Sequence, residues 1–114
     1  MIAVIFEFTP AEGRRPEYMA LAQGLSDDVA HADGFISIER FESLTTPGRY
    51  VSISFWRDED SVRDWRNLPG HRAAQAKGRG GVFEDYRLRV AEVLRDYTHE
   101  SRTEAPADSR AAHG

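Results

Sequence analysis

The sequence predicts an α+β domain whose elements follow one another in the order strand, helix, strand, strand, helix, strand. Apolar residues recur at steps of two in some segments, which is typical of strands, and at steps of three and four in others, which is typical of helices. Pro and Gly residues separate these segments and mark the turns. A chain of 114 residues with 40% hydrophobic content is sufficient for one such domain.

The first predicted strand covers residues 2–8 and is apolar on both of its faces. Side chains alternate along a strand, so the set that begins with Ile2 and ends with Phe8 points to one side, while Ala3 and Ile5 point to the other. A strand of this kind is normally covered on both sides. Helices can supply one cover, and we expect the other to come from elsewhere, for example from a second copy of the chain.

A helical pattern begins at Pro16, a residue suited to the first turn of a helix. Its apolar positions follow at steps of three and four residues: Tyr18, Leu21, Leu25 and Val29. Asp33 and Gly34 are expected to end this helix. Residues 35–42 and 50–56 are then strand-like runs joined by a turn at Pro47 and Gly48, which predicts an antiparallel hairpin.

Asp58 is a suitable N-cap for a second helix that carries Val62 and Trp65 on its apolar side. The pair Pro69–Gly70 interrupts this helix, and we expect it to continue through residue 75 to residue 78. The interruption would determine the direction in which His71 points.

The segment from residue 82 to residue 97 fits either a helix or a strand, and periodicity alone does not decide between them. We predict a strand, because glycines at 78–81 precede it and because the first strand would otherwise keep an unpaired edge. The resulting βαββαβ order predicts a ferredoxin-like antiparallel sheet with both helices on one face. Residues 1–98 would form this domain. Residues 99–114 would form a polar C-terminal tail that is disordered or orders on a partner.

The composition excludes several classes of function. The net charge of -4 provides no basic surface for nucleic acid, and no run of about 18 apolar residues could cross a membrane. Without cysteine there is no disulfide and no thiolate ligand, and the four histidines show no metal-ligand spacing. We therefore expect a soluble cytoplasmic protein that binds neither nucleic acid nor membrane.

Several segments together resemble the antibiotic biosynthesis monooxygenase (ABM) domain family over residues 2–97. They are the run 34–41, the run 54–57, Trp65, the run 71–75 and Asp85–Tyr86 leading into Arg89–Val90. The resemblance implies a dimeric α/β barrel, in which two sheets face each other and each subunit keeps a cavity between its sheet and its helices. The family includes cofactor-independent enzymes that oxidise phenolic rings with molecular oxygen, and enzymes that degrade haem.

If this chain resembled the haem-degrading branch of the family, it would carry an Asn on the first strand, a Trp on the second helix and an axial His late on that helix. Trp65 matches the tryptophan, but Gln75 stands near the histidine position and the first strand contains no Asn. His71 lies about one turn earlier and would ligate haem only if the helix were displaced. We therefore expect no haem and no other cofactor, with molecular oxygen as co-substrate.

The candidate catalytic residues are His71, as the base that deprotonates a phenol, and Trp65, as a wall of the cavity. Deprotonation matters because a phenolate gives up an electron to oxygen more readily than a phenol. The candidate substrate-binding residues are Phe6, Trp56, Gln75 and Tyr86. A structural role remains open for each: both tryptophans could be core residues, and His71 could form only local hydrogen bonds.

These observations favour a homodimeric monooxygenase that oxidises a small aromatic phenol or hydroquinone. The alternative is a non-catalytic dimeric module that binds a small ligand or has only a structural role. A haem-degrading monooxygenase is the third possibility. An open cavity on which His71 and Gln75 converge would favour chemistry, whereas a sealed apolar interior would favour binding.

Overall fold

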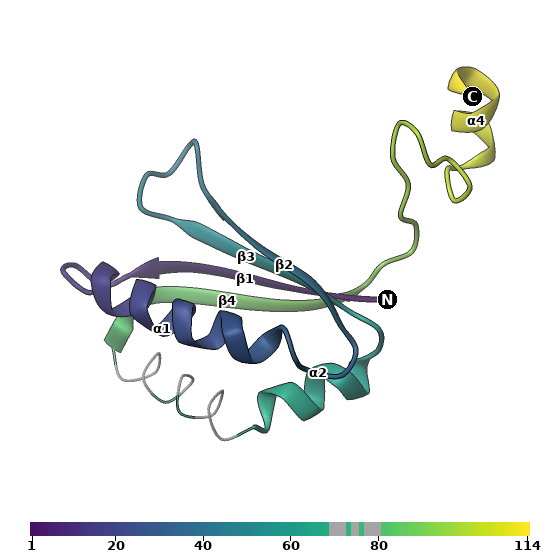
Figure 1. Ribbon diagram of the computed structural model, residues 1–114. Helices are drawn as coiled ribbons and strands as arrows, with labels where there is room; N and C mark the ends of the chain where they lie inside the picture. The colour runs from purple at the N-terminus through teal and green to yellow at the C-terminus, as the bar shows by residue number, and fades with distance from the viewer. Residues whose placement is uncertain (69–72, 74–75, 77–80) are drawn as a thin grey trace.

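The computed structural model describes residues 1–68, 73, 76 and 81–114. The elements lie at β1 (Ile2–Pro10), α1 (Arg15–Val29), β2 (Phe35–Glu42), β3 (Tyr50–Trp56), α2 (Glu59–Arg66), β4 (Phe83–Glu92) and α4 (Ala107–His113) (Figure 1). The βαββαβ order is confirmed, and both hairpin strands have the predicted bounds. The expected continuation of the second helix towards residue 78 falls largely outside the described residues.

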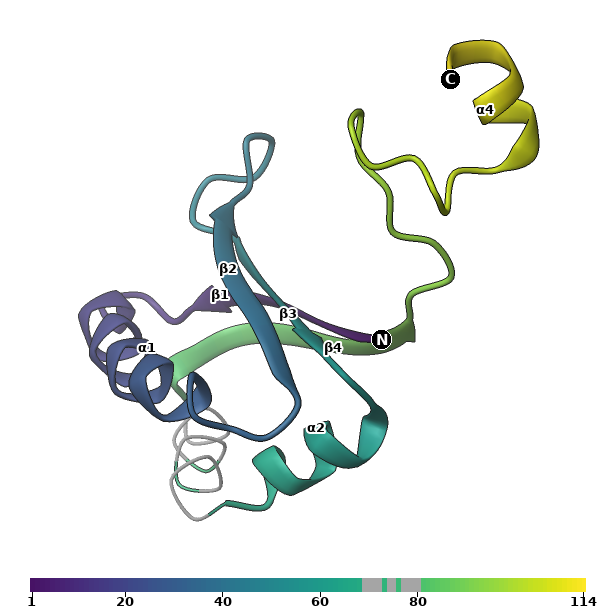
Figure 2. The ribbon, with the colours of Figure 1, turned by 45° about the vertical axis from the view of Figure 1, so that its right-hand side comes forward.

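The four strands form one antiparallel sheet in the order β2-β3-β1-β4. β1 is central and pairs with β3 on one side, from Ile2 opposite Trp56 to Phe8 opposite Tyr50. Both α1 and α2 lie on the same face of this sheet (Figures 1 and 2). The ferredoxin-like fold class is therefore confirmed.

The helix starts follow the predicted local rules. Pro16 occupies the first turn of α1, and the Asp58 side chain accepts a hydrogen bond from the backbone N–H of Ser61 at the start of α2. The end of α1 differs from the prediction, because the helix stops at Val29 and a short turn with backbone hydrogen bonds from His31 and Ala32 precedes Gly34. Gly34 then has a positive φ of 83°, which allows the chain to enter β2.

The ambiguous segment after residue 82 is a strand, as predicted. β4 pairs with β1 from Ile2 opposite Glu92 to Pro10 opposite Phe83. The pairing satisfies the backbone N–H and C=O groups along the second edge of β1, which explains why a sequence pattern compatible with a helix forms a strand here. The strand ends at Glu92, so it is shorter than the segment that suggested it.

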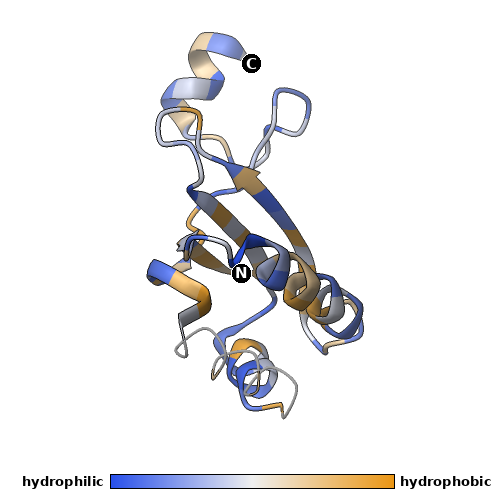
Figure 3. Cartoon of the chain, turned by 90° about the vertical axis from the view of Figure 1, so that its left-hand side faces the viewer, coloured by the Kyte–Doolittle hydropathy of each residue, from blue (hydrophilic) through white to orange (hydrophobic). Residues whose placement is uncertain are grey.

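The core consists of two clusters on the helix-facing side of the sheet. One contains Val29, Trp56, Val62 and Trp65, and the other contains Phe8, Tyr18 and Val82. Figure 3 shows apolar and polar residues alternating along the strands, so that each strand presents different residues to its two faces. No helix of the described chain covers the other face of the sheet (Figure 2). There the central strand β1 carries Ala3, which is buried at 7% exposure, and Ile5, which is half-buried.

The C-terminal tail includes a short helix in the structure. This helix is α4, the tail buries Ala105, and the Arg102 guanidinium lies 5.1 Å from the centre of the Tyr97 ring. Figures 1 and 2 show the tail projecting away from the sheet and both larger helices. The boundary at residue 98 stays a prediction. No helix among the described residues is long and apolar enough to cross a membrane.

Candidate active site

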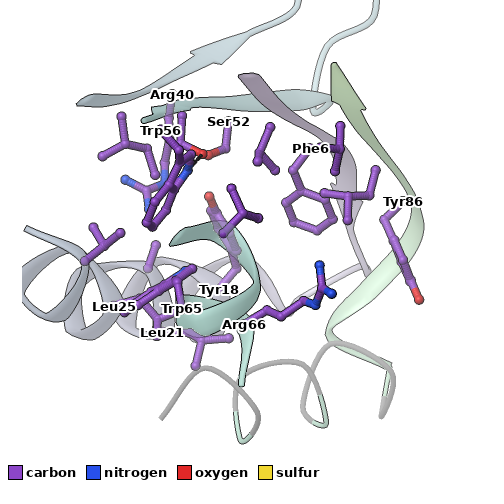
Figure 4. A pocket seen from close by; sticks show the side chains of 18 of the residues that line it. Phe6, Tyr18, Leu21, Leu25, Arg40, Ser52, Trp56, Trp65, Arg66 and Tyr86 are labelled. Carbon is purple, nitrogen blue, oxygen red and sulfur yellow. Dashed lines mark hydrogen bonds between the residues drawn. The ribbon is translucent and has the colours of Figure 1, made fainter. Parts of the chain in front are cut away.

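A cavity of about 330 Å³ lies between the inner face of the sheet and the helices α1 and α2 (Figure 4). Residues from both core clusters form its walls, including Trp56 and Trp65 from one cluster and Tyr18 from the other. Its volume is at the lower end of the range typical of small-molecule sites. Most lining side chains are aliphatic or aromatic, so the cavity suits a small, mainly apolar ligand.

Two small side chains on the inner face of β3 contribute to this hollow. The inward positions of β3 are Tyr50, Ser52, Ser54 and Trp56, because they pair with the inward residues of β1. Ser52 and Ser54 line the cavity where larger residues would fill it. The backbone of a central strand therefore approaches the open volume closely.

The two tryptophans are held side by side at one end of the cavity. Their ring centres are 6.2 Å apart, and the Trp56 indole nitrogen donates a hydrogen bond of 2.9 Å to the Ser54 hydroxyl. Phe35 packs edge-on against Trp56 with ring centres 5.5 Å apart. Trp56 is almost completely buried, at 1% exposure. These contacts fix the indole rings as rigid walls rather than mobile side chains.

The side of the cavity formed by β4 is the more open one. Tyr86, Leu88 and Val90 line the cavity and are each about half exposed. Phe6 on β1 lies behind them, with its ring centre 5.9 Å from that of Tyr86. A ligand could therefore enter on this side and meet aromatic surface at once.

Polar groups gather on the same inner face, at the edge of the sheet formed by β2 and β3. Arg40 on β2 lies directly across from Ser52 on β3, and both line the cavity together with Tyr18 of α1. The Tyr18 hydroxyl points up from α1 towards these two strands (Figure 4). Burial raises the pKa of the Tyr18 phenol, while the nearby Arg40 guanidinium acts in the opposite direction. The phenol is therefore neutral near pH 7 and can donate a hydrogen bond.

The structure brings together four of the six site residues predicted from the sequence: Phe6, Trp56, Trp65 and Tyr86. His71 and Gln75 lie outside the described residues, so the roles assigned to them stay predictions. Trp56 both packs beneath α2 and lines the cavity, so it is a core residue and a cavity-lining residue at the same time.

Sequence reasoning missed Tyr18, Arg40 and Ser52. Tyr18 was assigned to the apolar stripe of the first helix, which is correct but incomplete. The signal for the other two was available: Ile38 and Arg40 share one face of β2, and Ser52 and Ser54 share the inward face of β3. Polar or small residues at positions that should be apolar indicate a cavity wall rather than a filled core.

The described residues contain no group of three or more His, Asp or Glu side chains placed to hold a metal ion. The polar groups that line the cavity in the described part of the chain are hydroxyls, guanidinium groups and indole N–H groups. Donors of this kind can bind the oxygen atoms of an organic molecule.

The structure defines a ferredoxin-like α+β protein with an aromatic-lined cavity between its sheet and its helices. Residues 1–77 match the family model described as antibiotic biosynthesis monooxygenase. The chain belongs to this family, as its resemblance suggested.

One similar protein is named as a monooxygenase. The chain is 48% identical over 93 residues to the jasmonate monooxygenase ABM of Pyricularia oryzae, which covers 82% of this chain but 43% of that protein. This chain thus spans less than half of that relative's length.

The solved structures show the same fold at lower identity. Rv0793 from Mycobacterium tuberculosis superposes with a TM-score of 0.76 at 22% identity, over 85% of this chain and 98% of that one. SnoaB from Streptomyces nogalater, described as a cofactor-independent oxygenase, superposes with a TM-score of 0.70 at 17% identity, over 83% of this chain and 94% of that one.

Proposed function

We propose that this protein is a cofactor-independent monooxygenase that oxidises a small, mainly apolar organic molecule with molecular oxygen. The observation that carries the proposal is the cavity lined by Trp56, Trp65 and Phe6 in a chain of the monooxygenase family. The 48% identity to a protein named as a monooxygenase supports it. The description of the structural neighbour SnoaB as cofactor-independent is consistent with it.

A phenol or hydroquinone is the substrate class that fits this chemistry best. Monooxygenation of either is balanced by oxygen alone: a ring carbon loses hydrogen and gains one oxygen atom, and the second oxygen atom leaves as water. A phenol gives a quinone in this way, and a hydroquinone gives a hydroxyquinone. The substrate supplies all the electrons, so no external reductant is required. The aromatic walls would hold a planar ring and exclude water from the reactive intermediate.

The name of the Pyricularia relative favours a second substrate class, a cyclic ketone that carries a carboxylic acid, as jasmonate does. Hydroxylation of an unactivated carbon in such a molecule requires two additional electrons and two protons, because one oxygen atom must still leave as water. A reductant would therefore have to be supplied in the assay. This requirement separates the two substrate classes experimentally.

In the proposed site Trp65, Trp56, Phe6 and Tyr86 surround the substrate ring. His71 is the proposed base that removes the phenolic proton, and Gln75 is the proposed partner of a polar substrate atom. A general base of this kind contributes about a hundredfold or more to the rate.

The test follows oxygen uptake and quinone absorbance together when simple phenols are supplied under air, since a phenol gives a quinone only if an oxygen atom is inserted. We expect one oxygen molecule consumed per quinone formed, and a loss of at least about a hundredfold in kcat for His71→Ala. His99→Ala is the matched control, because His99 is an exposed histidine of the tail whose side chain is 88% accessible. Equal turnover by wild type and His71→Ala would show that His71 is not the base.

Two further outcomes would replace the proposal. Binding of phenols without oxygen uptake would favour the non-catalytic module. A Soret shift on addition of haem, followed by loss of the haem spectrum with a reductant, would favour haem degradation.

We also propose that the protein acts as a homodimer through the face of the sheet that the helices leave open. The inward and outward residues of β1 alternate, and its outward residues lie beside Phe55, Ile53 and Val51 of β3. These three side chains are only half-buried in the single chain. An apolar sheet face of this kind is normally covered, and a second copy would cover it in the way the family's barrel arrangement implies.

A further inference from the structure

The cavity wall is mainly apolar, and three of its polar side chains gather at one corner. The corner consists of Tyr18 from α1, Arg40 from β2 and Ser52 from β3. Arg40 and Ser52 are cross-strand partners, so their side chains emerge from the same face of the sheet close to each other. Tyr18 is buried at 7% exposure, and Ser52 is half-buried. Figure 4 shows the Tyr18 hydroxyl directed at these two strands.

A second contact ties the exposed Arg40 side chain to α1. Arg40 Nη1 donates a hydrogen bond of 3.3 Å to the hydroxyl of Ser26 on α1. The Ser26 hydroxyl in turn donates to the carbonyl of Ala22 at 2.9 Å. These bonds link Arg40 to the helix, and a side-chain hydrogen bond from Arg40 also opposes the rise that burial causes in the pKa of the Tyr18 phenol. A guanidinium has five N–H donors, so these two contacts do not use all of them.

The charge of the lining residues differs from that of the whole protein. The chain has 19 acidic and 15 basic residues, yet the lining residues that the structure describes include two arginines, Arg40 and Arg66, and no carboxylate. Arg66 extends from the end of α2 towards the side of Tyr86 (Figure 4). A positive cavity in an acidic protein attracts an anion and is poorly suited to a cation.

The two sides of the cavity offer different chemistry to a ligand. The corner at β2 and β3 contributes hydrogen-bond donors and the charge of Arg40, whereas the open side at β4 is formed by Tyr86, Leu88 and Val90, with Arg66 extending towards it. A ligand with one anionic end and an apolar body would satisfy both sides at once. The fork of Arg40 matches the two oxygen atoms of a carboxylate better than a single hydroxyl.

We infer that Tyr18, Arg40 and Ser52 bind the carboxylate of an organic monocarboxylate whose apolar body lies between the tryptophans and the open side of the cavity. This inference rests on the proposed function only in placing the substrate in this cavity. It identifies Arg40 as a specificity-determining residue. It assigns no chemical step to the corner.

The test measures binding and does not depend on turnover. Trp56 and Trp65 are the only tryptophans of the sequence, and both line the cavity, so their fluorescence reports its occupancy. The probes are 4-phenylbutyrate and the neutral 4-phenylbutyramide, which have similar size. We expect wild type to bind the carboxylate at least about tenfold more tightly than the amide, as one charge-assisted contact allows.

Substitutions identify the residues that cause the preference for the carboxylate over the amide. Arg40→Gln is expected to weaken carboxylate binding about tenfold and to change amide binding less than about twofold. Tyr18→Phe keeps the buried ring and is expected to weaken binding of the carboxylate several-fold. Arg63→Gln removes the same charge from the exposed side of α2, where Arg63 pairs with Asp60, and should change neither affinity. Circular dichroism confirms that each variant folds.

Three results would overturn the inference. The first is equal binding of carboxylate and amide by wild type, or no binding of the carboxylate at millimolar concentration. The second is an unchanged preference in both Arg40→Gln and Tyr18→Phe. The third is loss of the preference in Arg66→Gln but not in Arg40→Gln, which would place the anion at the α2 side. A preference for the carboxylate probe, together with no oxygen uptake when phenols are supplied, would count against the proposed oxygenase activity but leave the carboxylate corner intact.

Discussion

Asp58 connects local sequence to the position of Trp65. Its Oδ1 accepts hydrogen bonds from the Ser61 backbone N–H at 2.8 Å and from the Ser61 hydroxyl at 2.7 Å. These bonds satisfy donors that the first turn of α2 would otherwise leave unpaired. The cap determines where α2 begins, and Trp65 lies within the eight residues of that helix. One carboxylate therefore contributes to the position of a cavity wall.

Acid should weaken this cap in a defined pH range. The hydrogen bonds from Ser61, followed by that from Arg57, lower the pKa of Asp58 from 3.8 to about 2. A carboxyl whose pKa is lower in the folded state contributes stability above its unfolded pKa and loses it as pH falls towards the folded value. We expect thermal stability to decrease between about pH 4 and pH 2, with part of the decrease due to Asp58.

Asp58→Asn is the matched variant, because an Asn can cap the helix but does not titrate in this range. Thermal melts from pH 6 to pH 2 should show a smaller decrease for Asp58→Asn than for wild type. Asp58→Ala, which cannot cap, should lower the melting temperature at pH 7 by about 5 °C. Identical pH profiles for wild type and Asp58→Asn would exclude the cap as an acid-sensitive contact.

At the scale of elements, the junction between β2 and α2 depends on a close approach at Gly34. A Cβ built on Gly34 would lie 2.0 Å from the Ser61 hydroxyl oxygen and 2.6 Å from the Ser61 Cβ. The Gly34 carbonyl also accepts a hydrogen bond of 2.8 Å from the Arg57 backbone N–H. Gly34 therefore allows the start of β2 to lie against the first turn of α2, and this contact helps to hold the helix over the sheet.

Gly34→Ala is expected to destabilise the protein by about 3 kcal/mol, because it adds both a steric overlap and a strained positive φ. Gly24→Ala is the control within α1: nothing lies within 4 Å of its added Cβ, and alanine favours a helix, so a gain of about 0.5–1 kcal/mol is expected. Urea unfolding measures both changes. Equal effects of the two substitutions would contradict the assigned role of Gly34.

At the scale of the whole molecule, the two faces of the sheet carry different features. The inner face carries the cavity, whereas the outer face combines apolar residues such as Ile53 with a charged group in which Glu7 accepts hydrogen bonds from Arg49 and Arg89. The two arginines lower the pKa of the Glu7 carboxyl, with the hydrogen bond from Arg49 as the largest cause. The proposed dimer would use the apolar part of this outer face.

Ile53→Asp is expected to convert the proposed dimer to a monomer, since Ile53 lies opposite Ile5 of the central strand and a buried unpaired charge disfavours association. Leu44→Asp is the control, because Leu44 lies in the hairpin loop and is fully exposed. Light scattering at micromolar concentration measures the mass of each variant. A monomeric wild type, or a dimer that tolerates Ile53→Asp, would contradict the proposed interface.

The sequence by itself determined the element order, the hairpin, the cap at Asp58 and the family. Apart from the last strand, these features depend on residues close together in the chain, whose periodicity and turn chemistry are visible without coordinates. It also identified four lining residues, because aromatic residues at inward positions are candidates for both core and cavity. The strand identity of residues 83–92 required one non-local argument, the unpaired edge of β1.

Only the tertiary structure decided that the interior is hollow and that one corner of it is polar. Tyr18, Arg40 and Ser52 lie on three separate elements, and each alone has an ordinary explanation in its own segment. Their proximity follows from strand register and from the way in which α1 crosses the sheet. Register and packing depend on contacts between residues distant in sequence, so neither the hollow nor its polar corner can be obtained from local pattern alone.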